Sequence, residues 1–99
     1  MSSQKYRTEI EIISEIFEII MNAGIKGEYI TIIVRNANLS HNVALDKLNK
    51  LIKAGLIKIS EEKKNKVFII TEEGIKFYRQ LREFDELVEE IRVRDTKMT

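Results

Sequence analysis

Cysteine and proline are absent from this chain of 99 residues, and histidine occurs only once. Without cysteine the chain can form neither a disulfide framework nor a thiolate metal site. One histidine cannot supply the cluster of ligands that a zinc site usually needs. We therefore expect no metal, no other cofactor, and a reducing, intracellular setting.

Long hydrophobic runs are also missing. Glutamates interrupt the apolar residues near the N-terminus, so residues 1–21 fit neither a signal peptide nor a membrane span. With 43% hydrophobic content, the chain can build one modest core. These features predict a folded protein in the cytoplasm with no membrane contact.

Catalytic signatures are equally scarce. Ser40 and His41 are adjacent, so on a helix their side chains diverge by about 100° and cannot act as nucleophile and base. The sequence contains no glycine-rich phosphate loop and no pair of carboxylates at the end of a strand. We expect no enzymatic activity, and we predict no small-molecule ligand.

The net charge is only +1, but the charged groups are unevenly distributed. Residues 1–35 carry four basic and five acidic groups, residues 36–70 carry seven and three, and residues 71–99 carry six and eight. Because salt screens charges beyond roughly 10 Å, a local surplus matters more than the total. The middle third is therefore expected to form a local basic face.

Two helices are predicted in the first third. Thr8 and Glu11 match a capping box and Gly24 is a natural terminator, so a helix should lie between them. Its apolar residues cover an arc of roughly 200°, about twice the usual width, which predicts two packing neighbours, including a second long helix. Ile25 could form a short strand. We interpret the β-branched segment Tyr29–Arg35 as a helix, because the next element needs a helical partner.

A third helix is predicted between Ser40, a good N-cap, and Gly55. The apolar side chains expected to hold it to the domain are Val43, Ala44, Leu48, Leu51 and Ile52. The opposite, polar face consists of Asn42, Asp46, Asn49, Lys50 and Lys53, with Lys47 at its edge.

A hairpin and a long helix are predicted in the last part of the chain. Residues 56–60 and 66–71 are rich in β-branched side chains and flank a polar turn, and Thr71 can cap the helix that follows. The heptad seam of that helix comprises Phe77, Leu81, Phe84, Val88, Ile91 and Met98. A helix over residues 74–98 would be about 37 Å long, more than one small core covers, so its outer half needs a partner. Alternatively, the seam folds back onto the first helix.

Three helices, a two-stranded hairpin and a long helix form the element order of a winged helix-turn-helix, an α+β (mainly α) fold. The chain resembles small archaeal winged-helix DNA-binding proteins, nucleoid-associated or regulatory, over about residues 8–91. The resemblance is clearest at Asn36–Ser40 and Leu51–Lys58. Those proteins dimerise through an antiparallel coiled coil of C-terminal helices. The resemblance implies a DNA-binding domain over residues 1–73 and a dimerisation helix, continuous with it, over residues 74–99.

The residues themselves also fit DNA binding. An exposed helix can enter the major groove, where asparagine pairs with adenine and lysine reaches guanine or a phosphate. The contacts expected with double-stranded DNA are Ser40, His41, Asn42, Lys47, Asn49, Lys50, Lys53, Lys63, Lys64, Asn65 and Lys66. We expect a homodimer, held by the heptad seam, that acts as a transcription regulator or a nucleoid-associated protein.

Other interpretations stay open. The polar face of the third helix could simply be solvated, and the lysines of the hairpin tip could only blunt a sheet edge. Asp46, Glu61 and Glu62 would repel a nearby phosphate. The alternative function is that of a winged-helix protein–protein interaction module in a larger assembly.

Overall fold

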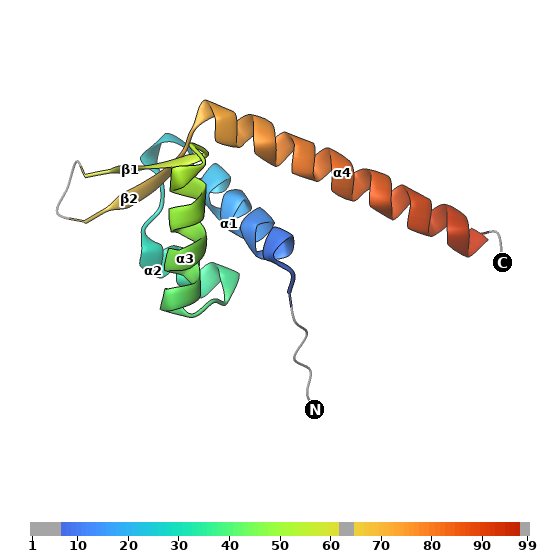
Figure 1. The fold of residues 1–99 in the computed structure, drawn as a ribbon, viewed down its shortest axis with the longest axis horizontal. Helices are drawn as coiled ribbons and strands as arrows, with labels where there is room; N and C mark the ends of the chain where they lie inside the picture. The colour runs from blue at the N-terminus through green and yellow to red at the C-terminus, as the bar shows by residue number, and fades with distance from the viewer. Residues whose placement is uncertain (1–6, 62–64, 98–99) are drawn as a thin grey trace.

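The computed structural model describes residues 7–61 and 65–97 and shows a helical domain with a small sheet and one projecting helix (Figure 1). The elements are α1 (Glu9–Ala23), the 3-10 turn η1 (Gly24–Lys26), α2 (Ile30–Ala37), α3 (His41–Lys53), β1 (Ile57–Ser60), β2 (Val67–Ile70) and α4 (Glu72–Lys97). The predicted fold class, a mainly helical winged helix with a two-stranded antiparallel sheet, is confirmed. No helix in these two ranges is long and apolar enough to span a membrane.

Helix α1 begins with the predicted capping box. Thr8 Oγ1 accepts from the Glu11 amide at 3.1 Å, and the Thr8 amide donates to Glu11 Oε1 at 2.8 Å. Gly24 ends the helix with a φ of 67°. As its wide apolar arc predicted, α1 has several neighbours: it contacts α2, β2 and α4. Ile10, at its open end, is still 48% exposed.

The strand predicted at Ile25 is wrong. Ile25 lies in η1 and is 94% exposed, because Gly24 and Gly27 on either side both adopt positive φ and turn the chain sharply. The strand-like pairing occurs at Glu28, which exchanges two backbone hydrogen bonds of 2.9 Å with Phe68. A Cβ on Gly27 would lie 2.5 Å from Val67 Cγ1, so only glycine permits this close approach.

Helix α2 confirms that its β-branched segment is helical. Ile33 and Ala37, one turn apart, are both buried, and α2 packs against α1 and α3. Burial of this face outweighs the modest intrinsic cost of β-branched residues in a helix. The helix ends at Asn38, which adopts the left-handed conformation with a φ of 54°.

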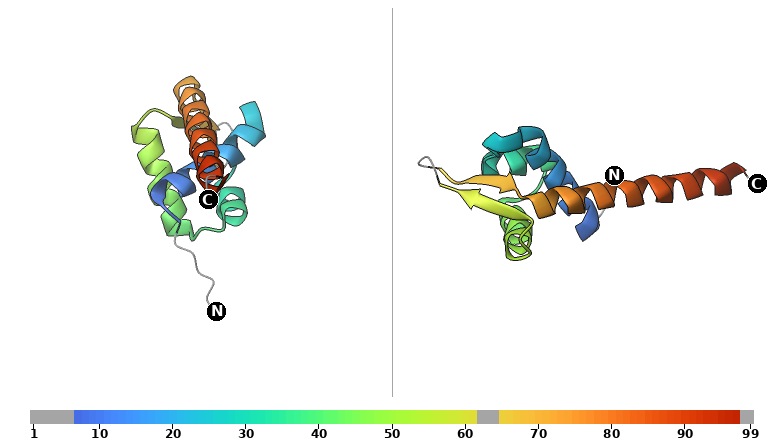
Figure 2. Two further views of the ribbon diagram at one scale, coloured as in Figure 1. Left: turned by 90° about the vertical axis from the view of Figure 1, so that its right-hand side faces the viewer. Right: turned by 90° about the horizontal axis from the view of Figure 1, so that it is seen from above.

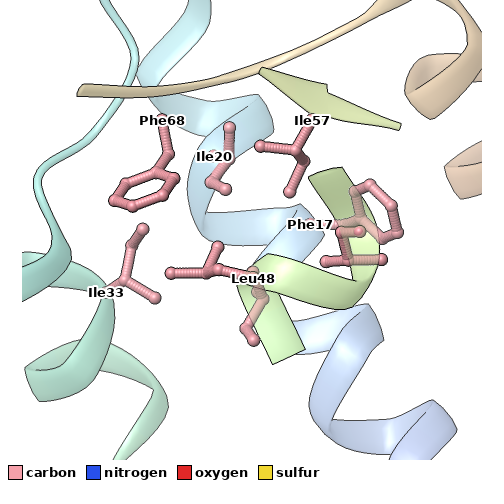
Figure 3. Close-up of a cluster of buried hydrophobic side chains, with 8 residues drawn as sticks. Phe17, Ile20, Ile33, Leu48, Ile57 and Phe68 are labelled. Carbon is pink, nitrogen blue, oxygen red and sulfur yellow. The ribbon is translucent and has the colours of Figure 1, made fainter. Parts of the chain in front are cut away.

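The core lies where α1, α2, α3 and the sheet meet. Strands β1 and β2 pair antiparallel, with Ile57 opposite Ile70 and Ser60 opposite Val67. Figure 3 shows the central side chains from all of these elements pointing toward one another: Phe17, Ile20, Ile33, Leu48, Ile57 and Phe68. This cluster fixes the positions of α3 and of the hairpin relative to each other.

The start of α4 is tied to the turn between α3 and β1. Thr71 Oγ1 donates to the Gly55 carbonyl at 2.7 Å and accepts from the Gly74 amide at 3.0 Å. A Cβ on Gly74 would come close to the Leu56 carbonyl oxygen, so the first turn of α4 packs backbone against backbone. Beyond its first turns, α4 projects from the end of the domain opposite to the hairpin (Figures 1 and 2).

Candidate nucleic-acid interface

Helices α2 and α3 form a helix-turn-helix. The turn runs through the left-handed Asn38, and the Leu39 amide donates to the Val34 carbonyl at 3.0 Å. Ser40 is the N-cap of α3, as predicted, since its Oγ accepts from the Val43 amide at 3.2 Å. This local hydrogen bond gives Ser40 a structural role, whatever it contacts in a complex.

The buried face of α3 is narrower than predicted. Ala44, Leu48 and Leu51 are buried, and Ile52 packs at the edge of the core. The prediction that Val43 holds the helix to the domain is wrong, because Val43 is 39% exposed. On a helical wheel Val43 lies about 100° from Ala44 and about 140° from Leu48, which turns it away from the core.

The opposite face of α3 is open to solvent, at the surface of the domain (Figure 1). Asn42, Asn49 and Lys53 fall within about 40° of one another on a helical wheel, and all three are exposed. His41 is exposed at the first turn. Lys53 forms no hydrogen bond or ion pair with any residue in the described part of the chain. This face therefore presents two amides and one unpaired cation.

Unlike Lys53, Lys47 and Lys50 both have acidic partners. Glu9, the first residue of α1, accepts from Lys47 Nζ at 3.0 Å and from Lys50 Nζ at 2.7 Å through the same oxygen, Oε2. Asp46 Oδ2 lies 3.4 Å from Lys47 Nζ and 3.8 Å from Lys50 Nζ. The hydrogen bond from Lys50, followed by that from Lys47, lowers the pKa of Glu9, and Glu9 in turn raises the pKa of Lys50.

The expectation of a freely available lysine face on α3 thus needs correction. Lys47, predicted at the edge of the polar face, has a side chain that is only 15% exposed. Sequence reasoning missed Glu9 because it lies 38 and 41 residues from the two lysines. The only sequence signal was its place in an acidic first turn, which the favourable interaction with the helix dipole already explained.

Arg7 is a second residue whose role the sequence did not reveal. Its Nη1 donates to Glu15 Oε1 at 2.6 Å and to the Ala37 carbonyl at 2.7 Å, and its Nη2 donates to the Asn38 carbonyl at 2.9 Å. The guanidinium therefore satisfies carbonyl groups at the C-terminal end of α2 and joins them to α1. These hydrogen bonds anchor the turn between α2 and α3 to the start of the chain's first helix.

The hairpin extends away from the domain, on the side opposite to the projecting α4 (Figures 1 and 2). Asn65 and Lys66, predicted to contact DNA, are exposed. Lys63 and Lys64 lie outside the described residues, as does Met98 of the predicted seam.

The predicted dimerisation seam divides into two parts. Phe77 and Leu81 are partly buried against the chain's own core, with the ring of Phe77 5.6 Å from that of Phe17. Farther along, Phe84, Val88 and Ile91 are 61%, 36% and 58% exposed. Leu87, which the heptad did not include, is 53% exposed beside them. We name the four residues Phe84, Leu87, Val88 and Ile91 the outer stripe of α4.

Known structures share this arrangement. The DNA-binding protein Sso10a-2 from Sulfolobus solfataricus is similar, with a TM-score of 0.77, 26% identity and 93% of each chain covered. AF1382 from Archaeoglobus fulgidus has a TM-score of 0.66 and 20% identity over 79% of this chain and 87% of that one. F-93 of SSV1 has a TM-score of 0.61 and 20% identity over 91% and 99%. No curated protein matches the sequence.

The family assignment rests on the sequence as well as on the shape. Residues 6–89, which include everything from α1 into the outer half of α4, match the family described as winged helix-turn-helix. The element order, the turn between α2 and α3 and the β1–β2 wing agree with that description. The chain belongs to the winged helix-turn-helix family.

Proposed function

We propose that the protein is a non-catalytic, homodimeric binder of double-stranded DNA that acts in the cytoplasm as a transcription regulator or as a nucleoid-associated protein. The observation that carries this proposal is the exposed face of α3, where Asn42, Asn49 and Lys53 project together from a rigid helix-turn-helix. The similarity to Sso10a-2, which is described as a DNA-binding protein, supports it.

The chemistry of this face suits the major groove. The groove is about 12 Å wide and admits one helix, and the side-chain amide of asparagine can bond adenine with two hydrogen bonds. Asn42 and Asn49 lie on one exposed face of α3. Lys53, on the same face, can reach a guanine or a phosphate. Ser40 and His41, at the N-terminal turn of α3, would lie near a phosphate, where exposed backbone amides also favour an anion.

The hairpin would add contacts outside the major groove. Its lysines, Lys63, Lys64 and Lys66, together with Asn65, suit the sugar-phosphate backbone or the adjacent minor groove. Such contacts position the protein and raise its affinity for any sequence, whereas the amides of α3 would supply discrimination between sequences.

The outer stripe of α4 supports the homodimer. Four large apolar side chains on a projecting helix leave an apolar surface that a second copy would cover. Residues 83–90 contain five acidic and no basic side chains, whereas residues 92–97 contain three basic and one acidic. Parallel pairing would align the acidic segments of the two helices along their whole length, whereas antiparallel pairing of the outer stripes brings Glu83 of one helix near Arg92 of the other. The charge pattern therefore favours an antiparallel pair.

A charge-reversal pair tests the DNA-binding proposal. Lys53→Glu should weaken binding to a mixed-sequence duplex by at least tenfold, because it replaces a cation beside the phosphates with an anion. Lys76→Glu, an equal charge change on the exposed side of α4, should alter affinity little. Fluorescence anisotropy gives both affinities, and circular dichroism checks the fold. Equal affinities for the two variants would remove α3 from the interface.

An interaction module in a larger assembly is the second candidate function. The observation in its favour is a separate apolar surface around η1 and β1, where Ile25, Tyr29 and Ile59 are 94%, 37% and 36% exposed. A chain that is monomeric and is not retained on DNA or heparin at low salt would support this function instead.

A further inference from the structure

The Glu9 carboxylate forms ion pairs with two lysines of α3, Lys47 and Lys50. Its Oε2 is 3.0 Å from Lys47 Nζ and 2.7 Å from Lys50 Nζ, so one carboxylate serves two cations on the proposed DNA-binding helix. Asp46, on α3 itself, lies within 4 Å of the same two ammonium groups. The four side chains form one network at the edge of the exposed α3 face.

The backbone that carries Glu9 is held in place by its neighbours in the chain. Thr8 and Glu11 fix the first turn of α1 through the capping box, and Arg7 is anchored to Glu15 and to the end of α2. The first turn of α1, from which the Glu9 side chain extends, is therefore anchored on both sides of Glu9. The fold brings the start of α1 to α3 and leaves this carboxylate beside the lysines.

A DNA phosphate would compete with this carboxylate. Phosphate and carboxylate oxygens are both anionic acceptors for an ammonium group, and each of the two lysines already has an acidic partner within hydrogen-bonding distance. The Glu9 and Lys50 side chains are each about half exposed, and ion pairs of this kind are weak enough for a strongly charged ligand to displace. Lys53 has no such competitor among the described residues.

We propose that Glu9 is an internal competitor for the DNA backbone, which lowers sequence-independent affinity and so leaves more of the binding to the amides of α3. This inference rests on the proposed DNA-binding function. In the free protein Lys47 and Lys50 are paired with Glu9, and Asp46 lies within 4 Å of both. On DNA binding, the two lysines either remain paired with Glu9 and contribute little to the binding free energy, or they exchange Glu9 for a phosphate. The free energy needed to break the ion pairs with Glu9 then weakens binding to every DNA sequence equally.

The matched variants Glu9→Gln and Glu18→Gln test this proposal. Both remove one negative charge from an exposed position of α1, but Glu18 has no ion pair with a described residue of α3. Measured by anisotropy on a mixed-sequence duplex, Glu9→Gln should bind roughly tenfold more tightly at about 0.1 M salt. Its slope of log affinity against log salt should steepen by about one to two per chain. Glu18→Gln should change affinity less than twofold.

A double-mutant cycle separates competition from a general change in charge. Lys50→Gln should weaken binding less than twofold when Glu9 is present, because the ammonium group of Lys50 is already paired with that carboxylate. In the Glu9→Gln background the same change should weaken binding by about fivefold. Additive effects of the two substitutions would overturn the proposal.

The failure of this proposal can be distinguished from the failure of the proposed function. If the wild-type protein binds the duplex and Glu9→Gln binds equally or more weakly, Glu9 is not a competitor, and only this inference fails. If neither the wild type nor Glu9→Gln binds at low salt, the proposed function itself fails. Thermal unfolding of each variant, followed by circular dichroism, confirms that all of the compared proteins are folded.

Discussion

The inner and outer halves of α4 belong to one continuous helix but have different surroundings. In the inner half, Phe77, Tyr78 and Leu81 pack on the core, and the Phe77 and Tyr78 rings lie 5.6 Å and 6.3 Å from that of Phe17. In the outer half, Phe84 and Ile91 are 61% and 58% exposed. The same heptad pattern therefore stabilises the domain in one half and leaves an apolar surface uncovered in the other.

Heptad periodicity therefore identifies an apolar face of a helix but does not identify what covers that face. The predicted alternative, a seam that folds back onto the first helix, is realised for the inner half through the contacts between α1 and α4. Self-association stays a proposal for the outer half. The predicted division at residues 73 and 74 also stays a prediction, although the packing of Phe77 shows that the start of α4 contributes to the core.

The largest contrast is expected between Phe17→Ala and Phe84→Ala. Phe17 is fully buried where α1 meets α4, so its truncation should lower the free energy of unfolding by about 3–5 kcal/mol. Phe84→Ala removes a side chain of similar size from the outer stripe and should leave the stability of the domain nearly unchanged. Urea unfolding, at a protein concentration too low for dimers, measures both. Similar losses of unfolding free energy in both variants would mean that the outer half of α4 contributes to the stability of the domain as much as the contact between α1 and α4 does.

A smaller but sharper effect is expected from Val88→Lys in the outer stripe. In a dimer this change would bury an unpaired charge and cost about 3 kcal/mol of association energy, which is more than a hundredfold in the dissociation constant. Analytical ultracentrifugation should show monomers at concentrations where the wild type is dimeric. Lys76→Gln, on the inner half but exposed, serves as the control. A variant that stays dimeric at these concentrations would place the interface elsewhere.

The smallest of the three effects concerns the joint between the domain and α4. A methyl group on Gly74 would collide with the Leu56 carbonyl, so Gly74→Ala should destabilise the fold by about 1–3 kcal/mol. Gly24→Ala has open space around the new methyl, but its φ of 67° and ψ of −146° lie near a region almost confined to glycine, so it should cost about 1–3 kcal/mol through backbone strain alone. Thermal unfolding compares the two. A neutral Gly74→Ala would show that α4 can shift away from the turn before β1.

Local signals made the secondary structure predictable. The capping box at Thr8, the N-cap Ser40 and the terminators Gly24 and Gly55 act on neighbouring backbone groups, so the sequence alone identifies them. The segment now seen as α2 was harder, because its β-branched residues favour a strand. Its helical state depends on burying Ile33 against other elements, which only the order of the elements suggested.

The site was less predictable than the fold because its electrostatics are not local. The polar face of α3 follows from helical periodicity, and Asn42, Asn49 and Lys53 are exposed as expected. The pairing of Lys47 and Lys50 with Glu9 depends on how α1 crosses α3, which spacing within one helix cannot indicate. Val43 shows a related limit, since a residue at the edge of an apolar arc is buried or exposed according to its neighbours.

Salt dependence shows whether a local basic surface of this protein binds the DNA backbone despite a net charge of only +1. If a dimer of this protein neutralises about six to eight phosphates, log affinity plotted against log salt should have a slope of about −5 to −7. The measurement is a series of equilibrium titrations of the wild-type protein into a labelled mixed-sequence duplex, from about 0.05 M to 0.2 M salt. A slope in this range supports binding to the DNA backbone through this surface, and an affinity that does not change with salt would contradict it.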